Sequence, residues 1–271
     1  MHLIRLGSSR RLIGTPMPDL DAWISAVRTS QNRFAALLAP LDAEQVQHPS
    51  YDDDWSIAQV ASHLGSQSEI FDLALDAGLN GSPTPGMEQF QPLWDAWNGR
   101  SPEAQAADSV KANEALVSRI EGLSGTDRAR FRVSLFGRDI DLAGLLAMRL
   151  GEHALHTWDI AVALDSSAVV SPDAVHLLID VLPGTAARAG RAAAEPRVLA
   201  VETADPQRRF TLTTGPDVEL ASASGTGPVD LVLPAEELLR LVYGRLDPDR
   251  TSAELPGHEV VPELLQVFPG V

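Results

Sequence analysis

The stretch RLGEHALHTWDIAVAL (residues 149–164) decides how the rest of the sequence is interpreted. Apolar side chains recur in it at helical spacing, and Glu152 and His156 stand four residues apart. Residues four apart lie on one face of an α-helix, with their Cβ atoms about 6 Å apart. A carboxylate and an imidazole at that separation can bind one divalent metal ion. The pattern therefore predicts a helix over residues 142–164 that carries two metal ligands.

A third ligand is expected from a distant helix that contains His63. In the segment DDDWSIAQVASHL (residues 52–64), Ser56 and Gln59 have the spacing of a capping box, which predicts a helix from residue 56 to about residue 79. Two imidazoles and one carboxylate leave at least one coordination position for water or substrate, as in catalytic zinc sites. We therefore interpret His63, Glu152 and His156 as the ligands of a metalloenzyme.

Other residues of the 149–164 helix leave alternatives open. Glu152 and His156 could instead form a buried hydrogen-bonded pair, in which case a cation such as Arg149 must compensate the carboxylate. His153 competes as a ligand, but it projects about 100° away from Glu152 around the helix axis, so we interpret it as an outer bystander. Asp159 either braces the imidazole of His156 and fixes its tautomer, or is an ordinary exposed acid.

Composition restricts the chemistry. The net charge of −16 argues against a nucleic-acid surface, which requires clustered cations, and no apolar run is long enough for a membrane span. Because the chain has no cysteine, it can supply neither a disulfide nor a thiol nucleophile, and any sulfur chemistry must come from a cofactor. Lys111 is the single lysine and alanine is abundant, a bias that indicates a GC-rich genome.

The periodicity changes once along the chain, which predicts an α+β protein. We expect residues 1–18 to form a flexible extension that is not a signal peptide, residues 19–194 a helical bundle, and residues 195–271 a small α/β domain. Besides the two helices above, helices are expected at residues 19–39 and 102–121 and after Ser171 and Pro172. Residues 80–100 are expected to form a Gly/Pro-rich loop, a lid or pocket wall that carries Trp94 and Trp97, and residues 130–141 an irregular or hairpin-like excursion.

The segments 52–64 and 149–164 together resemble the mycothiol-dependent maleylpyruvate isomerase family. The resemblance implies a DinB-like four-helix bundle in which a metal between the helices is held by His63, Glu152 and His156. Two further segments, RFTLTTGPDVEL (residues 209–220) and PVDLVLPAEELLRLVYGR (residues 228–245), look like that family's small, loosely sterol-carrier-like α/β domain. Arg245 occupies the place of a family arginine that faces the metal site, which implies a catalytic role.

This resemblance also implies a function. A divalent metal, for which zinc is expected although nickel, cobalt and iron suit the same ligands, would activate mycothiol as its thiolate. The thiolate would transfer to an electrophile or assist cis–trans isomerisation of a maleylpyruvate-like acid. The expected partners are thus a small thiol and an electrophilic or unsaturated acid, and neither nucleic acid nor membrane is expected as a partner. The protein is expected to be monomeric or weakly dimeric, cytoplasmic and actinobacterial.

Two alternatives stay open at this point. A metal-dependent hydrolase would use metal-bound water, with Asp159 or His153 as the general base. A non-catalytic protein would use the α/β part to carry a small apolar ligand on the bundle as scaffold. The sequence does not identify the second substrate.

Overall fold

The structure is a computed structural model that describes residues 19–51, 54–135, 137–247 and 256–270. The expected N-terminal extension (residues 1–18), with His2, and the first two aspartates of the DDDW motif lie outside the described residues. Within the described ranges, no helix has both the length and the apolar character needed to cross a membrane.

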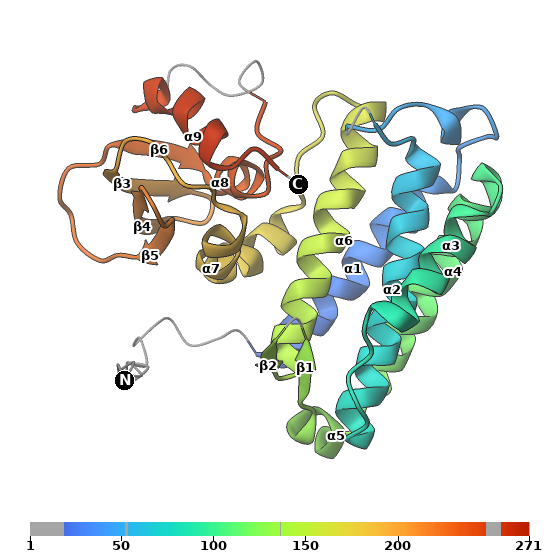
Figure 1. Cartoon of the computed structure of the whole chain (residues 1–271). Coiled ribbons are helices and arrows are strands. Elements are labelled where there is room, and N and C mark those ends of the chain that lie inside the picture. Colours follow the sequence, from blue (N-terminus) through green and yellow to red (C-terminus); the bar gives the residue numbers. More distant parts are fainter. Residues whose placement is uncertain (1–18, 52–53, 136, 248–255, 271) are drawn as a thin grey trace, which may run out of the picture.

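Four long helices form the bundle and lie side by side in Figure 1. They are α1 (Leu20–Leu38), α2 (Ile57–Asn80), α4 (Pro102–Glu121) and α6 (Leu142–Leu164). α1 and α2 each pack against both α4 and α6, and their apolar stripes form the core, in which Trp23, Phe34 and Leu64 are fully buried. The predicted α+β class with a DinB-like four-helix bundle is confirmed.

Side-chain caps fix where the two helices with the predicted ligands begin. The Ser56 hydroxyl accepts from the Gln59 N–H at 3.2 Å, and the Gln59 Oε1 accepts from the Ser56 N–H at 2.8 Å, which confirms the predicted capping box of α2. At the start of α6, Asp141 Oδ1 accepts from the Gly144 N–H at 2.9 Å. The starts of both helices are therefore fixed by sequence-local contacts.

The prediction of a loop over residues 80–100 is wrong for most of that segment. Residues Met87–Asn98 form helix α3, although Pro92 lies inside it and removes one backbone hydrogen bond. Burial compensates for the lost hydrogen bond, since Phe90 and Trp97 lie on one side of the helix and are 5% and 1% exposed.

The predicted excursion at residues 130–141 is a β-hairpin that follows a short helix, α5 (Gly125–Arg130). Its strands are β1 (Val133–Leu135) and β2 (Arg138–Ile140), and they are joined around Gly137, whose φ is +75°.

The C-terminal part contains a four-stranded sheet in the order β5-β4-β3-β6. Its strands are β3 (Arg197–Ala204), β4 (Arg208–Thr214), β5 (Glu219–Ser222) and β6 (Leu231–Pro234), of which β3 and β6 pair in parallel and the other neighbours antiparallel. The remaining elements are α7 (Pro172–Ala189), α8 (Ala235–Val242), α9 (Val261–Val267) and the 3-10 turns η1 (Gln45–Gln47) and η3 (His258–Val260). α7 contacts α6 of the bundle as well as β5 and α8, as Figure 1 shows, so the division of the chain at residues 194/195 stays a prediction.

Gly65 provides a test of how α3 is held on α2. A Cβ at this position would meet the ring of the buried Trp97 at 2.3 Å. Although alanine favours helix by about 1 kcal/mol, the overpacking costs about 1–3 kcal/mol, so Gly65→Ala should lower the free energy of unfolding. Gly184→Ala is the matched control, because the new Cβ in α7 meets only the Arg188 guanidinium at 3.5 Å. Urea unfolding that finds both variants equally stable would contradict this packing.

Candidate metal centre

The three predicted ligands converge between α2 and α6. His63 Nε2 lies 3.6 Å and His156 Nε2 lies 3.8 Å from Glu152 Oε2, and the three ligand atoms all lie within 4.8 Å of one another. Tetrahedral zinc with bonds of about 2.0–2.2 Å holds neighbouring ligand atoms roughly 3.4 Å apart. The donor set therefore fits a divalent metal after shifts of a few tenths of an ångström for the two contacts to Glu152.

The imidazole of His156 is held from behind by Asp159. His156 Nδ1 lies 2.8 Å from Asp159 Oδ2, and Arg245 donates to both oxygens of the same carboxylate, from Nε at 2.8 Å and from Nη2 at 2.9 Å. Burial acts to raise the pKa of Asp159, but the hydrogen bonds from His156 and Arg245 hold it below its usual value. An ionised Asp159 accepts the Nδ1 proton, which leaves the Nε2 lone pair of His156 directed at Glu152. The side chain of Asp159 is 1% exposed, so it is not a surface acid.

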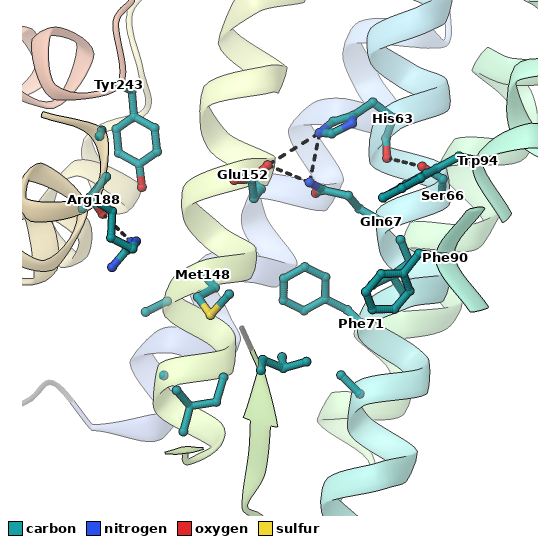
Figure 2. Close-up of a pocket in the computed structure, with 18 of the residues that line it drawn as sticks. His63, Ser66, Gln67, Phe71, Phe90, Trp94, Met148, Glu152, Arg188 and Tyr243 are labelled. Carbon is teal, nitrogen blue, oxygen red and sulfur yellow. Dashed lines mark hydrogen bonds and ion pairs between the residues drawn. The ribbon is translucent and has the colours of Figure 1, made fainter. Parts of the chain in front are cut away.

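Gln67 is a member of this site that the sequence analysis missed. Arg149 Nη1 donates to Gln67 Oε1 at 3.1 Å, and since a guanidinium only donates, the amide oxygen must face Arg149. The amide nitrogen then donates to Glu152 Oε2 at 2.7 Å and contacts His63 Nε2 at 2.9 Å, as Figure 2 shows. The amide nitrogen thus contacts two of the prospective ligand atoms, and a bound metal would replace it at their lone pairs. The sequence feature that could have indicated Gln67 is its position four residues after His63, on the same face of α2.

Arg149 supplies the positive charge expected near Glu152, but it acts through Gln67. Its guanidinium is fully buried and also donates to Asn113 Oδ1 and to the Leu64 carbonyl. Burial lowers the pKa of Arg149 to about 10, which still leaves it charged at neutral pH. Burial acts to raise the pKa of Glu152, but contacts with His63, His156 and Gln67 bring it to about 2. Burial lowers the pKa of His63, which favours the neutral imidazole that can ligate a metal.

His153 does not join the cluster. Its Nδ1 lies 2.8 Å from Ser30 Oγ, and its ring packs edge-on against Phe34 of α1. It is therefore a bystander, as expected, but the expectation that it lies on the outside is wrong. The reason is tertiary, because α1 covers that side of α6 and leaves His153 1% exposed.

A large cavity of about 1180 Å³ opens beside the cluster. Trp55 forms its wall next to the two imidazoles, with ring centroids 5.2 Å from His63 and 6.3 Å from His156. Helix α3, in place of the expected loop, supplies part of the wall through Phe90 and Trp94. Figure 2 shows Phe90 below the His63–Gln67–Glu152 group and Trp94 beside it. The apolar wall and the polar cluster thus belong to one space.

Comparison with known proteins places this site in a family. Residues 27–161, which include all three prospective ligands, match the mycothiol maleylpyruvate isomerase N-terminal domain. The chain belongs to the mycothiol-dependent maleylpyruvate isomerase family. The crystal structure of a mycothiol-dependent maleylpyruvate isomerase superposes with a TM-score of 0.63 and 14% identity, covering 84% of this chain and 90% of that chain. A point mutant of that enzyme superposes almost equally, with a TM-score of 0.62, and the likeness establishes the shared fold.

Two further relatives match parts of the chain. A protein of Geobacillus thermodenitrificans (strain NG80-2), whose name assigns it provisionally to the metal-dependent hydrolases, is 33% identical over 73 residues, which are 27% of this chain and 40% of that protein. YfiT from Bacillus subtilis, described as having an unusual four-helix bundle topology, superposes with a TM-score of 0.41 and 17% identity, covering 58% of this chain and 93% of that chain.

Asp159→Asn tests whether the carboxylate sets the metal affinity. An asparagine can present its amide nitrogen to His156 and no longer fixes the Nδ1 proton, so we expect metal affinity to fall about tenfold. The matched control is Asp180→Asn, which breaks a similar two-bond pair with Arg208, at 2.6 and 3.0 Å, away from the cluster. Competition with a chelator should show weakened binding in the first variant alone, and equal affinities in wild type and Asp159→Asn would return Asp159 to a purely structural role.

Proposed function

We propose that the protein is a divalent-metal-dependent enzyme that activates a low-molecular-weight thiol, mycothiol by its family, as the thiolate. The thiolate serves either S-transfer to an electrophile or thiol-assisted cis–trans isomerisation of a maleylpyruvate-like acid. The observation that carries the proposal is the convergence of His63, Glu152 and His156 at the edge of a cavity large enough for two small molecules. Ligand pockets typically measure about 300–1,000 Å³.

Each residue of the cluster has a role in this proposal. His63, Glu152 and His156 would hold the metal, for which zinc is the best match to two imidazoles and a carboxylate. When bound, a divalent metal favours the deprotonated form of a thiol at neutral pH. Gln67 and Asp159 orient the ligand side chains, and Trp55 limits access of water to the imidazoles. The absence of cysteine fits a reaction whose sulfur comes from outside the chain.

Arg245 takes part as a positioning residue. Two of its nitrogens donate to Asp159, Nη1 donates to the Tyr243 carbonyl at 3.0 Å, and Nη2 lies 3.4 Å from His156 Nδ1. Because the guanidinium is committed to Asp159, we propose that it acts on the reaction through the His156 imidazole. This role differs from the direct catalytic role that the family resemblance implies for Arg245.

Hydrolysis with a metal-bound water is less well supported. It needs a general base in the cavity, and the two candidates from the sequence are placed elsewhere: Asp159 lies behind His156, and His153 faces α1. Neither belongs to the described residues that line the cavity. The hydrolase name of the Geobacillus relative covers only a 73-residue match. A non-catalytic carrier would not require the oriented cluster.

Cobalt substitution tests the thiol proposal directly. Excess mycothiol should produce a sulfur-to-cobalt charge-transfer band in the cobalt-loaded protein, because a thiolate would enter the open coordination position. His156→Ala should lose stoichiometric metal and the band, whereas His176→Ala, which removes an exposed histidine bonded to the Pro172 carbonyl, should keep both. An unchanged spectrum at saturating thiol, or full metal content in His156→Ala by elemental analysis, contradicts the assignment.

Arg245→Lys separates positioning from substrate binding. Lysine keeps the charge but loses the two-bond geometry with Asp159, so we expect turnover to fall on the order of tenfold while metal content is retained. The readout is a full kinetic analysis with mycothiol and an electrophile that the wild-type protein turns over. A lower kcat at unchanged KM supports positioning, and a raised KM for the acceptor would instead mean that Arg245 grips the substrate.

A further inference from the structure

The cavity continues well beyond the prospective metal ligands. Glu152, Met148 and Gly144 line it at four-residue intervals along α6, which corresponds to about 12 Å of helix. Along α2 the lining runs from His63 past Phe71 to Ala74. At the far end, Gly144 meets Ile140 of β2, and the lining includes the hairpin. A molecule with one end at the cluster can therefore extend along α6 to the hairpin.

The middle of this cavity is apolar. Phe71, Phe90, Trp94 and Met148 lie along it, and Figure 2 shows Phe71, Phe90 and Met148 below the cluster. No acid is placed there, since among the described lining residues Glu152 is the only carboxylate, and it belongs to the cluster. This section suits an aryl or alkyl group.

Two arginines line the cavity away from the cluster. Arg138 comes from β2, and Arg188 comes from α7, on the other side of α6 from α2. Within the described part of the chain neither guanidinium pairs with a carboxylate: Arg188 donates to the Gly184 carbonyl and to Thr185 Oγ1, and Arg138 makes no side-chain hydrogen bond or ion pair. Burial lowers the pKa of Arg188, and repulsion by the positive charge of Arg138, which lines the same cavity, lowers it further. An anion between them would relieve that repulsion.

We propose that the second substrate is an amphipathic organic acid, whose apolar body lies against Phe71, Phe90 and Met148 and whose anionic end is held by Arg138 and Arg188. This inference rests on the proposed function, because it places the reactive carbon at the metal cluster. A short acid that fills only the vicinity of the cluster would leave both arginines without a counter-ion. The selected acid must instead place its anionic group on the order of 12 Å from its reactive carbon. A maleylpyruvate-like acid is too short for this, so the inference belongs to S-transfer and not to isomerisation.

Binding of dansyl probes tests the anion site without any catalysis. The probes are dansyl-aminohexanoic and dansyl-aminoundecanoic acid, each compared with its primary amide, and binding is followed by energy transfer from tryptophan to the dansyl group. We expect the wild-type, metal-loaded protein to bind the acids about tenfold more tightly than the amides, since two partly exposed charge-assisted pairs each contribute only modestly. The preference should fall as ionic strength rises.

The double variant Arg138→Gln/Arg188→Gln should bind acid and amide alike, with the amide affinity unchanged. Arg191→Gln removes one positive charge two residues after α7 at a position that does not line the cavity, and should keep the preference. Equal binding of acid and amide by wild type, or a preference retained in the double variant, would overturn the proposal.

Kinetics separate this inference from the proposed function. With mycothiol and ω-bromo acids as electrophiles, bromodecanoic acid should be used more efficiently than bromopropionic acid, and the double variant should lose this advantage through a higher KM for the acid. A raised KM for mycothiol instead would show that the arginines hold the thiol, which contradicts the inference. Absence of thiol-dependent turnover with every electrophile, combined with intact acid preference in the binding assay, would reject S-transfer as the proposed function and leave the anion site standing.

Discussion

The contact between Asp159 and Arg245 is the interaction on which the site and the fold both depend. Asp159 belongs to α6 of the bundle, and Arg245 follows α8 in the C-terminal part. A buried carboxylate is tolerated only when it is paired and hydrogen-bonded, and Asp159 meets this requirement with the guanidinium on one side and His156 on the other. The orientation of one prospective metal ligand is therefore set by a residue from the other end of the chain. The Tyr51 hydroxyl donates to the Arg245 carbonyl at 3.2 Å and ties the segment before α2 to the same point.

A second buried cation organises the opposite side of the cluster. Arg149, Gln67 and Glu152 form a chain of hydrogen bonds in which each partner determines the orientation of the next. Arg149 lacks a carboxylate of its own in the described structure and is stabilised by amide and carbonyl oxygens. The negative charge of Glu152 in turn counteracts the lowering of the Arg149 pKa by burial. The two guanidinium groups thus support the ligands from both sides, and both act through an intermediate side chain.

The features that could be predicted from the sequence are those that depend on residues close together in the chain. At the helix starts, the Ser56 and Asp141 side chains accept from backbone N–H groups three residues later, and the convergence of Glu152 with His156 follows from helical spacing alone. Helix α3 could not be predicted in this way, because Pro92 inside it and the glycines that flank it favour a loop, whereas burial of Phe90 and of Trp97 against Gly65 stabilises the helix. Gln67 carries no chemical signal by itself, and its importance arises from Arg149 on another helix.

The two arginines of the cavity wall could not be recognised as one site from the sequence, because only the tertiary structure brings them to the same cavity. Arg138 and Arg188 stand fifty residues apart on a hairpin and on α7, and each alone resembles an ordinary exposed arginine. The chain as a whole carries a net charge of −16, which would repel an organic anion if all charges acted equally. At physiological ionic strength, however, interactions between exposed charges are screened beyond about 8 Å. An anion inside the cavity is therefore governed mainly by its immediate neighbours, and near Arg138 and Arg188 these are cationic.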